Sequence, residues 1–316
     1  QTIQLVLILA ILWSYALLAG FSASIVRAVS MFSFLAYAMF LNRPTNSFNI
    51  MALSLFFILL MGPMFLFQVG FQMSYLAVFA ILWIYPILQN MWSPNNQILK
   101  KIWQLTSVSI AAQLGVLPIA LFYFHQFPGL FFLSNLAIVP FLGIILGLGI
   151  IVIILALTNL LPSLLAIIYH KMIASMNWIV GWIGEQEVFI FKNISFDLVQ
   201  VLLSYILLVC ILIFLPKRSP KRLLVIMVMV ISFQSYLIYV NYTAQTKEEI
   251  AVMHQTRNTV LFHRTGNTLT ISATDQNKVT KLQEDYLTAE RIESVNHTPL
   301  QNTYTLKGQQ LYILDS

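Results

Sequence analysis

A chain of 316 residues in which 59% are hydrophobic and only 9% are charged lies far from the composition of soluble domains, where about 25% of residues are charged. The formal net charge is +6 at pH 7, and residues 1–240 hold ten Lys and Arg against three Asp and Glu. This composition excludes an ordinary water-soluble domain over that region. The single cysteine, Cys210, excludes a disulfide framework or a metal–thiolate site within one chain.

Apolar segments long enough to cross a membrane recur through residues 1–240. About 20 mostly apolar residues span a hydrocarbon core of about 30 Å, so we predict about nine transmembrane or interfacial helices. The segment 160–184 also fits an interfacial position, because it contains His170, Lys171 and Asn177. The predicted segments, in chain order, are 3–19, 21–41, 48–66, 70–88, 102–124, 130–157, 160–184, 198–215 and 221–240.

Polarity divides the chain into two predicted domains. Residues 1–240 form a multi-helix transmembrane domain, and residues 241–316 form a small water-soluble tail with seven Lys and Arg and eight Asp and Glu. The expected fold is an all-α polytopic membrane protein with a small α+β soluble C-terminal domain. Because Gln1 runs into an apolar segment without the features of a secretory signal, we expect the membrane domain to be N-terminally incomplete. The tail ends soon after an apolar strand, so we expect it to be truncated as well.

The tail shows the alternation of apolar and polar residues that predicts strands. Residues 260–271 alternate on both sides of Gly266-Asn267, which predicts a hairpin. Apolar residues at helical spacing over 279–292 predict a helix, and residues 304–314 predict a second hairpin around Lys307-Gly308. We expect such a domain to dock or scaffold other proteins outside the membrane.

Lysine and arginine in short loops predict the orientation, because positively charged loops remain in the cytoplasm. Placing the most basic loop inside and alternating through nine segments puts the acidic loop at 185–197 and the C-terminal tail on the non-cytoplasmic side. The excess of positive charge either follows from this topology alone or attracts an anionic substrate. The residues of the predicted cytoplasmic basic loops are Arg43, Lys100, Lys101, Lys217, Arg218, Lys221 and Arg222.

Polar side chains within the predicted spans favour a neutral, hydrated path. No Asp or Glu falls within any predicted span, which argues against a carrier coupled to protons or sodium. Polar residues recur instead at helical spacing, and they either line a pore or hydrogen-bond between packed helices. Arg27 is either a charge in the pore wall or a residue that reaches the interface. The polar stripes are Thr106, Ser109 and Gln113; Gln68, Gln72 and Tyr75; and Arg27, Ser30, Ser33 and Tyr37.

Glycine and proline interrupt or end several of the predicted spans. The positions are Gly62-Pro63, Gly115 with Pro118, and Pro128-Gly129. Broken helices are tolerated in membranes where protein or water satisfies the freed backbone groups, so we expect broken or re-entrant elements beside a pore. For the first and third positions, turns between spans are the alternative.

Four sequence blocks follow one another over roughly residues 20–145: Gly20–Ala28 (GFSASIVRA); Asn42-Arg43-Pro44; Gly62-Pro63 with Gly70–Ala77 (GFQMSYLA); and Ala112–Pro118 (AQLGVLP) with Tyr123–Phe127 (YFHQF) and Asn135–Pro140. In this order the blocks resemble the ComEC-type competence protein family. The resemblance implies a channel of the bacterial inner membrane that admits single-stranded DNA during natural transformation. It also implies an external DNA-receptor protein and a cytoplasmic helicase-like motor with single-strand-binding proteins as partners, alongside membrane lipid. The oligomeric state stays open.

Carried over residue by residue, the resemblance implies two groups of site residues. The DNA path or pore lining comprises Arg27, Gln72, Ser74, Gln113 and Asn135. The motif and helix-break positions are Gly70, Phe71, Pro118, Phe124 and His125. The resemblance assigns no individual role within either group.

Departures from the family pattern bear on enzyme activity. Gly62 stands where relatives commonly have Asp, and the upstream spans of relatives do not precede Gln1. Many relatives end in a metallo-β-lactamase-like domain that binds two metals, whereas His254, His263 and His297 are scattered. We therefore expect no enzyme activity, metal or cofactor. The alternatives to a DNA channel are a transporter or flippase for another anionic solute, such as a lipid-linked sugar, and a non-conducting membrane scaffold.

Overall fold

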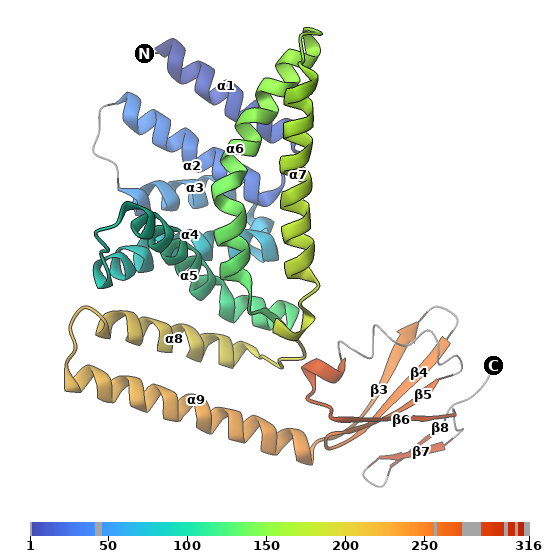
Figure 1. The fold of residues 1–316 in the computed structure, drawn as a ribbon. Helices are drawn as coiled ribbons and strands as arrows, with labels where there is room; N and C mark the ends of the chain where they lie inside the picture. The colour runs from blue at the N-terminus through green and yellow to red at the C-terminus, as the bar shows by residue number, and fades with distance from the viewer. Residues whose placement is uncertain are drawn as a thin grey trace. The chain divides into compact units, whose positions relative to one another are not determined.

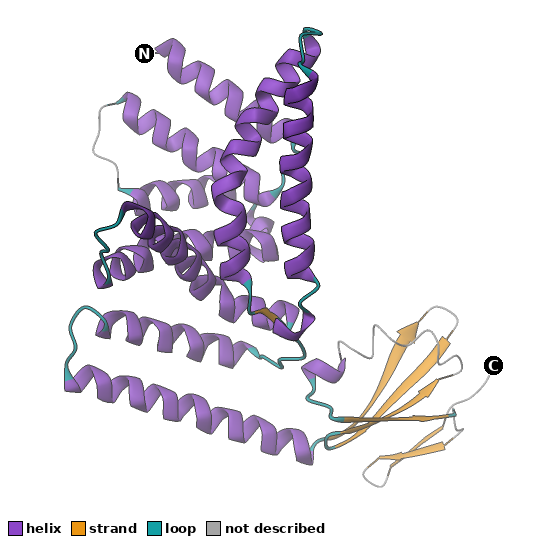
Figure 2. Ribbon diagram, viewed as in Figure 1, coloured by secondary structure: helices purple, strands orange, loops and turns teal. Residues whose placement is uncertain are grey.

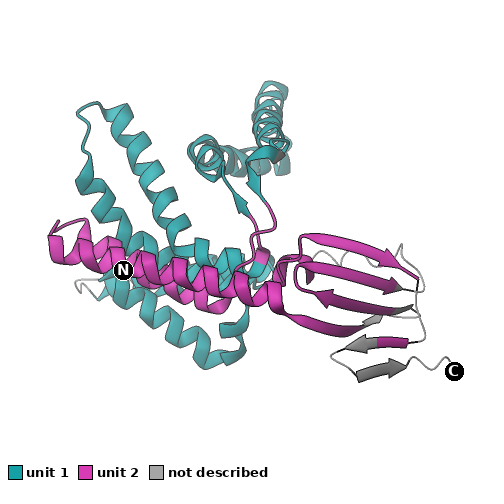
Figure 3. Cartoon of the chain, turned by 90° about the horizontal axis from the view of Figure 1, so that it is seen from below, with its two compact units in different colours: residues 1–123, 127–191 teal, residues 124–126, 192–316 magenta. Residues whose placement is uncertain are grey.

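The computed structural model of the chain divides into two compact units (Figure 3). The N-terminal unit comprises Gln1–Tyr123 and Phe127–Phe191, and the C-terminal unit comprises Phe124–Gln126 and Lys192–Ser316. The C-terminal unit thus contains two apolar helices besides the polar tail. The boundary between the compact units lies at residues 191–192, earlier than the change in polarity at residue 240. The structure describes all residues except 1, 42–45, 256–257, 274–285, 300–302, 307–308 and 313–316.

Nine α-helices lie within the described part of residues 2–246, and each coincides with one of the nine predicted segments (Figures 1 and 2). A further short helical stretch, at residues 286–289, precedes β6 (Ser294–Thr298). The boundaries of the nine helices differ from the predicted ones by a few residues because capping side chains decide where a helix begins. Asn46 and Asp197 each accept a backbone N–H at the start of α3 and α8. The helices are α1 (Thr2–Leu18), α2 (Ala23–Phe40), α3 (Ser47–Met61), α4 (Val69–Met91), α5 (Gln97–Phe124), α6 (Phe131–Leu157), α7 (Ser163–Gly184), α8 (Leu198–Phe214) and α9 (Pro220–Thr246).

Five of these helices, α4 to α7 and α9, are long and apolar enough to cross a membrane by length and composition. The shorter apolar helices are α1, α2, α3 and α8. Helix α7 corresponds to the segment 160–184, for which the sequence also allowed an interfacial position. It is one continuous helix of 22 residues and belongs to the five longer helices. This array confirms the predicted class, a helical membrane protein with a strand-containing C-terminal region.

Helices α1 to α4 of the N-terminal unit contact one another in sequence, and α2 also contacts α4. Where they meet, Ile58 of α3 is buried together with Phe71 and Tyr75 of α4. Helix α3 ends at Met61 because Gly62 adopts extended backbone geometry, and the short 3-10 helix η1 (Pro63–Phe67) follows. The helix break expected at Gly62-Pro63 is therefore present. Helices α6 and α7 of the same unit pack against each other as a hairpin (Figure 1).

The second expected break, at Gly115 and Pro118, is not observed, because α5 continues through both residues to Phe124. Gly115 instead allows close approach to α4: an added Cβ would lie 2.3 Å from Ala80 Cβ and 2.8 Å from the carbonyl oxygen of Leu76. Small residues at helix contacts are typical of membrane proteins, where close backbone packing drives association. The Gly115 and Pro118 pair therefore belongs to a buried helix contact, and the prediction of a helix break there is wrong.

The third position, Pro128-Gly129, is a turn between α5 and α6. Pro128 lies in the two-residue strand β1 (Phe127–Pro128), which pairs antiparallel with β2 (Ile190–Phe191). The 3-10 helix η2 (Glu187–Phe189) precedes β2, and the Gly129 N–H donates to the Phe189 carbonyl at 2.8 Å. These pairs join the start of α6 to the end of α7. Of the two alternatives for Pro128-Gly129, the structure therefore agrees with a turn between helices and not with a re-entrant element.

The C-terminal unit consists of the α8 and α9 hairpin followed by two small sheets. The larger sheet has the order β3-β4-β5-β6, antiparallel except for the parallel pair β5 and β6. Its second hairpin turns at Gly266 (φ +60°), as predicted. The other sheet is the predicted hairpin of β7 and β8, whose turn at 307–308 lies outside the described residues, as does most of the predicted helix before Tyr286. The strands are β3 (Glu248–Gln255), β4 (Asn258–Thr265), β5 (Thr268–Ala273), β6 (Ser294–Thr298), β7 (Thr303–Leu306) and β8 (Gln309–Tyr312).

A buried arginine attaches the larger sheet to the end of α9. Arg264 is 1% exposed, and its guanidinium donates to the carbonyl oxygens of Ala244 at 3.1 Å and Gly266 at 2.8 Å. The same guanidinium forms an ion pair with Glu290, which also accepts a hydrogen bond from Lys247 Nζ at 2.9 Å. The cation therefore satisfies one carbonyl at the C-terminus of α9, where positive charge is favourable, and one in the turn between β4 and β5.

Charge pairing shifts the titration of this cluster. Burial alone would raise the pKa of Glu290, but hydrogen bonding to Lys247 and the positive charges of Lys247 and Arg264 lower it below its usual value. Burial opposes the charged form of Lys247, yet hydrogen bonds to Glu249 and Glu290 raise the pKa of its ammonium group. The Glu290 carboxylate and the Lys247 ammonium group are therefore both charged at neutral pH.

Replacing Gly115 by alanine should destabilise the N-terminal unit, because the new methyl group overlaps Ala80 and the Leu76 carbonyl. Overpacking of this kind typically costs about 1–3 kcal/mol. The matched control is Gly143→Ala in α6, where an added Cβ meets no atom within 4 Å. Thermal unfolding of the detergent-solubilised chain measures the difference, and equal melting temperatures for the two variants would refute the close contact.

Replacing Glu290 by glutamine should loosen the sheet from α9. Loss of hydrogen bonds to charged partners removes about 1.5–3 kcal/mol, measured as faster hydrogen exchange in β4 and β5 at neutral pH. Since the pKa of Glu290 is lowered on folding, its stabilisation is present above the pKa of an unfolded glutamate, about 4.3. It is lost as the pH falls through the lowered value. The exposed Glu293→Gln is the control, and equal protection in both variants would contradict the role of Glu290.

Candidate functional site

Arg27 of α2 turns its guanidinium towards α4. Its Nη1 donates to the carbonyl oxygen of Ser74 at 2.9 Å, and its Cζ lies 6.0 Å from the centre of the Tyr75 ring. That distance is at the edge of the cation–π range. The structure thus brings two predicted path residues, Arg27 and Ser74, into direct contact. Nε of Arg27 is buried without a hydrogen-bond partner among the described residues.

A pocket of about 310 Å³ lies beside Arg27 in the N-terminal unit. Its walls are mainly apolar and come from α2, α3 and α4, with Met31, Ile50 and Val78 among them. Ser47 adds a hydroxyl-bearing side chain. The pocket therefore combines one fixed positive charge with an apolar surface.

The segment Gly70–Tyr75 divides its residues between burial and hydrogen bonding. Phe71 is 2% exposed and its ring centre lies 4.7 Å from that of Tyr75. The Tyr75 hydroxyl forms a buried hydrogen bond of 2.9 Å with Ser54 of α3. Phe71 is therefore a core residue, and Tyr75 links α3 to α4. Gly70 is exposed near the start of α4, and an added Cβ would meet no atom within 4 Å.

Gln72 uses its side-chain amide within the helix bundle. Its Nε2 donates to the Leu66 carbonyl at 2.8 Å, and its Oε1 accepts a hydrogen bond from the Tyr123 hydroxyl at 3.0 Å. These bonds tie η1 and the end of α5 to the first turn of α4. Gln72 therefore positions helices, and its amide is already occupied.

Gln113 and Asn135 line one pocket of about 460 Å³ in the N-terminal unit. Gln113 comes from the middle of α5 and Asn135 from the second turn of α6, while Val180 and Gly184 of α7 complete the wall. No hydrogen bond joins either amide to another described residue. The fold thus brings together two predicted path residues that are 22 positions apart, with both amides available.

Aromatic side chains border the same pocket, and sequence reasoning did not single them out. Phe131 at the start of α6 and Phe189 just before β2 both line it. Nearby, Phe127 and Phe191 of the paired strands stack with ring centres 6.3 Å apart and planes inclined by 16°. The density of phenylalanine between residues 122 and 132 is the sequence signal that was available. This signal points to a site only in the folded chain, where residues 187–191 lie beside the phenylalanines of this segment.

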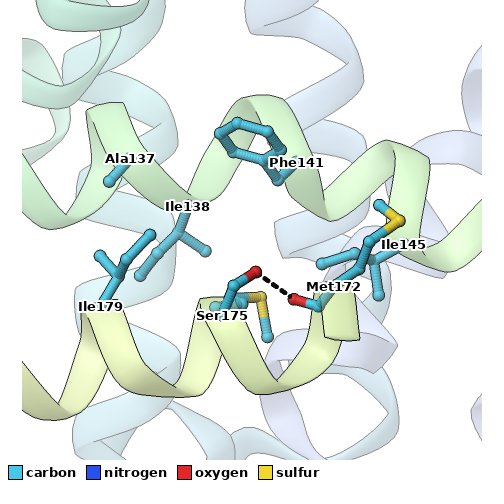
Figure 4. A pocket seen from close by; sticks show the side chains of 8 residues that line it. Ala137, Ile138, Phe141, Ile145, Met172, Ser175 and Ile179 are labelled. Atoms are coloured by element: carbon cyan, nitrogen blue, oxygen red, sulfur yellow. Dashed lines mark hydrogen bonds between the residues drawn. The ribbon is translucent and has the colours of Figure 1, made fainter. Parts of the chain in front are cut away.

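The cavity between α6 and α7 has a different character (Figure 4). Its walls are apolar, with Phe141 and Ile145 facing Met172 and Ile179. The Ser175 hydroxyl donates to the Met172 carbonyl of its own helix at 2.9 Å and is therefore already satisfied. This cavity contains none of the predicted path residues and offers no polar contact to a nucleic acid.

His125 and Phe124 belong to the C-terminal unit, where they meet the chain just before α8. His125 adopts a left-handed backbone conformation (φ +53°). Its carbonyl accepts the Ile194 N–H at 2.9 Å, and its Nδ1 lies 3.1 Å from the Ile194 carbonyl. Phe124 is exposed in the last turn of α5. His125 therefore acts as an anchor for the segment that leads into α8.

Four of the predicted loop cations lie on helices instead. Lys100 and Lys101 occupy the first turns of α5, which begins at Gln97, five residues before the predicted start. The physical reason is the Asn96 side chain, which accepts the Ile98 N–H at 2.8 Å and starts the helix early. Lys221 and Arg222 lie in the first turn of α9 for the same reason, since Ser219 accepts the Arg222 N–H. The loop assignment is wrong for Lys100 and Lys101, whereas Lys221 and Arg222 lie where the predicted segment 221–240 begins.

The remaining predicted basic positions divide into two cases. Lys217 and Arg218 are exposed in the loop between α8 and α9, as predicted. Arg222, next to that loop, donates to the Ile213 carbonyl at 2.8 Å and so satisfies the end of α8. Arg43 lies outside the described residues.

Potential metal ligands are scattered among the side chains that the structure describes. No three His, Cys, Asp or Glu residues lie close enough together there to hold a metal ion. His263 and His297 are in β4 and β6, whereas the side chain of His254 lies outside the described part.

Comparison with known proteins gives one family match and one curated relative. A family model described as "Competence protein" matches residues 1–218, which include α1 to α8 and every predicted path residue. ComE operon protein 3 of Bacillus subtilis (strain 168) is 29% identical over 222 residues, or 70% of this chain. The match covers 28% of the relative, so the chain spans less than a third of its length. No solved structure matches.

The hydroxyls of Ser54 and Tyr75 should prove energetically coupled. A double-mutant cycle of Ser54→Ala, Tyr75→Phe and the double variant should give a coupling near 0.6 kcal/mol, the average for hydrogen bonds between membrane helices. Stability of the solubilised chain provides the measurement. Strictly additive losses would show that the two hydroxyls do not act as a pair.

Proposed function

Since this chain belongs to the competence protein family and has several helices long and apolar enough to cross a membrane, we propose that it takes part in DNA uptake and that its N-terminal unit forms the path by which single-stranded DNA crosses the inner membrane. The family supports DNA handling in competence. What we propose beyond the family is the route through the N-terminal unit, a single strand as the substrate and the inner membrane as the location. Its support comes from the chemistry of the pocket that contains Gln113 and Asn135.

That pocket offers two kinds of contact suited to single-stranded DNA. Aromatic rings such as Phe131 and Phe189 provide faces on which bases of any sequence stack. The free amides of Gln113 and Asn135 donate to and accept from base edges and phosphate oxygens. The other ten residues that line the pocket, besides the two phenylalanines, include none with a charge. A strand can therefore bind there weakly and move on, as transport requires.

Electrostatics of the helices favour a polyanion. Residues 1–240 carry a net charge of +7, and the α-helices α1 to α9 contain no Asp or Glu. Phosphates are attracted to a positively charged surface and are not repelled by carboxylates within the spans. Arg27, held in place by the Ser74 carbonyl, supplies a fixed positive charge between α2 and α4. Its role in this proposal is to attract the strand, while Gln113 and Asn135 contact it.

Energy and strand delivery come from partners in this proposal. The chain contains no phosphate-binding glycine loop of the P-loop type. A helicase-like motor on the cytoplasmic side therefore pulls the strand, and a DNA-receptor protein outside presents it. The C-terminal tail lies on the non-cytoplasmic side, as the distribution of Lys and Arg indicates. The chain conducts DNA and performs no reaction on it.

Transformation frequency tests the path directly. A naturally competent host carries Gln113→Leu or Asn135→Leu in the full-length chromosomal copy, so that an amide is replaced by an apolar group of similar size. We expect at least a tenfold loss of transformants for each variant, because each amide faces the strand. Ser175→Ala, in the apolar cavity of α6 and α7, is the matched control and should transform at the parental frequency.

Protein level in the membrane and DNA bound at the cell surface are measured in parallel. Normal levels of both with few transformants locate the defect in passage through the membrane. Parental transformation frequencies for both amide variants would show that DNA does not pass Gln113 and Asn135. The path would then have to be assigned elsewhere.

A further inference from the structure

A polar pocket of about 440 Å³ lies in the C-terminal unit, at the end of the α8 and α9 hairpin that adjoins the sheets. Asn193 and Ser195 line it from the segment before α8, and Asn241 lines it from the last turns of α9. Arg291 and Glu293 line it from the turn before β6. None of these residues takes part in the proposed DNA path.

Arg291 is held in a conformation that normally belongs to glycine. Its φ is +57°, and the bonds from Glu290 N–H to the Tyr286 carbonyl and from Ile292 N–H to the Leu287 carbonyl close the turn around it. Such helix-ending turns favour glycine because a side chain is strained at positive φ. Backbone strain at a non-glycine residue is often retained where the side chain serves a function.

The guanidinium of Arg291 is only partly engaged. Nη1 donates to the Asn241 side-chain oxygen, which orients the group towards the end of α9. Nη2 is shielded from solvent and has no hydrogen-bond partner in the part of the chain that the structure describes. A buried cationic donor without a partner is costly. Arg291 lines the pocket, so turning its guanidinium towards a ligand with anionic oxygens would remove that cost.

The charges around the pocket match a zwitterion better than a polyanion. Arg291 contributes a positive charge and Glu293 a negative one, so the ionisable lining is neutral overall. The neutral polar side chains of Asn193 and Ser195 supply further hydrogen bonds, and Leu287 and Ile292 add apolar surface. A strand of phosphates would meet the Glu293 carboxylate, whereas a phosphate joined to an ammonium group pairs with both charges.

The position of the pocket along α9 places it at the level of lipid headgroups. Asn241 lies 21 residues after Pro220 on this candidate span, which is about 32 Å at a rise of 1.5 Å per residue. A hydrocarbon core is about 30 Å thick. With Pro220 at one surface, Asn241 lies at the other, where phosphate groups of the bilayer are found.

We propose that this pocket binds the headgroup of a phosphatidylethanolamine-type lipid. The phosphate diester accepts hydrogen bonds from Arg291, and the ammonium group pairs with the Glu293 carboxylate. Leu287 and Ile292 contact the apolar part of the lipid next to the headgroup. The bound lipid thereby fixes the start of the tail at the membrane surface.

Lipid retention by the purified full chain tests this site. The protein is reconstituted in nanodiscs with equal amounts of phosphatidylethanolamine and phosphatidylglycerol, then released into detergent, and its bound lipids are counted by native mass spectrometry. We expect the parent to retain phosphatidylethanolamine in preference, and Arg291→Gly to retain at least tenfold less. Glycine relieves the strain at this turn, so the variant should melt at the parental temperature or above it in lipid-free detergent.

Two further variants make the outcome specific. Glu293→Gln removes the carboxylate and should abolish the preference for phosphatidylethanolamine over phosphatidylglycerol. Lys221→Gln, an exposed cation at the other end of α9, should leave retention unchanged. Undiminished retention by Arg291→Gly, or an equal preference for both lipids in the parent, would overturn the proposal. Displacement of the lipid by a short oligothymidylate would identify nucleic-acid phosphate as the ligand and would overturn it as well.

Discussion

Hydrocarbon supplies no hydrogen-bond partners for backbone groups, and this constraint governs residues 2–246. The chain meets it with nine described helices whose N–H and C=O groups are paired internally. The hydrophobic effect does not drive these helices together, because lipid tails are as apolar as the helix surfaces. Close packing and hydrogen bonds between side chains must hold them together instead. Gly115 does so by allowing backbone contact with α4, and Ser54 does so through its bond to Tyr75. The broken backbone at Gly62 is tolerated where a 3-10 helix begins at once.

The same constraint explains which polar residues remain available for a substrate. Within a membrane-embedded bundle, most polar side chains are used to hold helices together, as Gln72 is by Leu66 and Tyr123. Gln113 and Asn135 differ because their amides face a pocket and contact no described hydrogen-bond partner. In our proposal these available amides contact the DNA strand beside aromatic rings on which its bases stack. Whether an amide side chain joins helices or faces a pocket depends on the tertiary structure and not on the residue type.

In the C-terminal unit the governing interaction is a buried cation. Arg264 satisfies the Ala244 carbonyl at the end of α9 and is balanced by Glu290, so the sheet continues from the helix as one compact unit. Arg291, from the neighbouring turn, reaches the same helix at Asn241 but leaves the buried Nη2 without a described partner. Two arginines that look alike in the sequence thus differ in their contacts, because every guanidinium nitrogen of Arg264 makes a hydrogen bond within the protein whereas Nη2 of Arg291 makes none to a described residue.

Hydropathy and charge by themselves determined the membrane class, the nine helical segments and the β4 and β5 hairpin of the tail, since these depend on local periodicity and on the length of a bilayer span. The motif blocks determined the family. Helix ends were less predictable because single capping residues such as Asn96 set them. Only the tertiary structure showed that α5 continues through Pro118, that Gln72 is occupied, and that Gln113 meets Asn135 beside Phe131 and Phe189. Those facts depend on contacts between segments far apart in the chain, which no local pattern encodes.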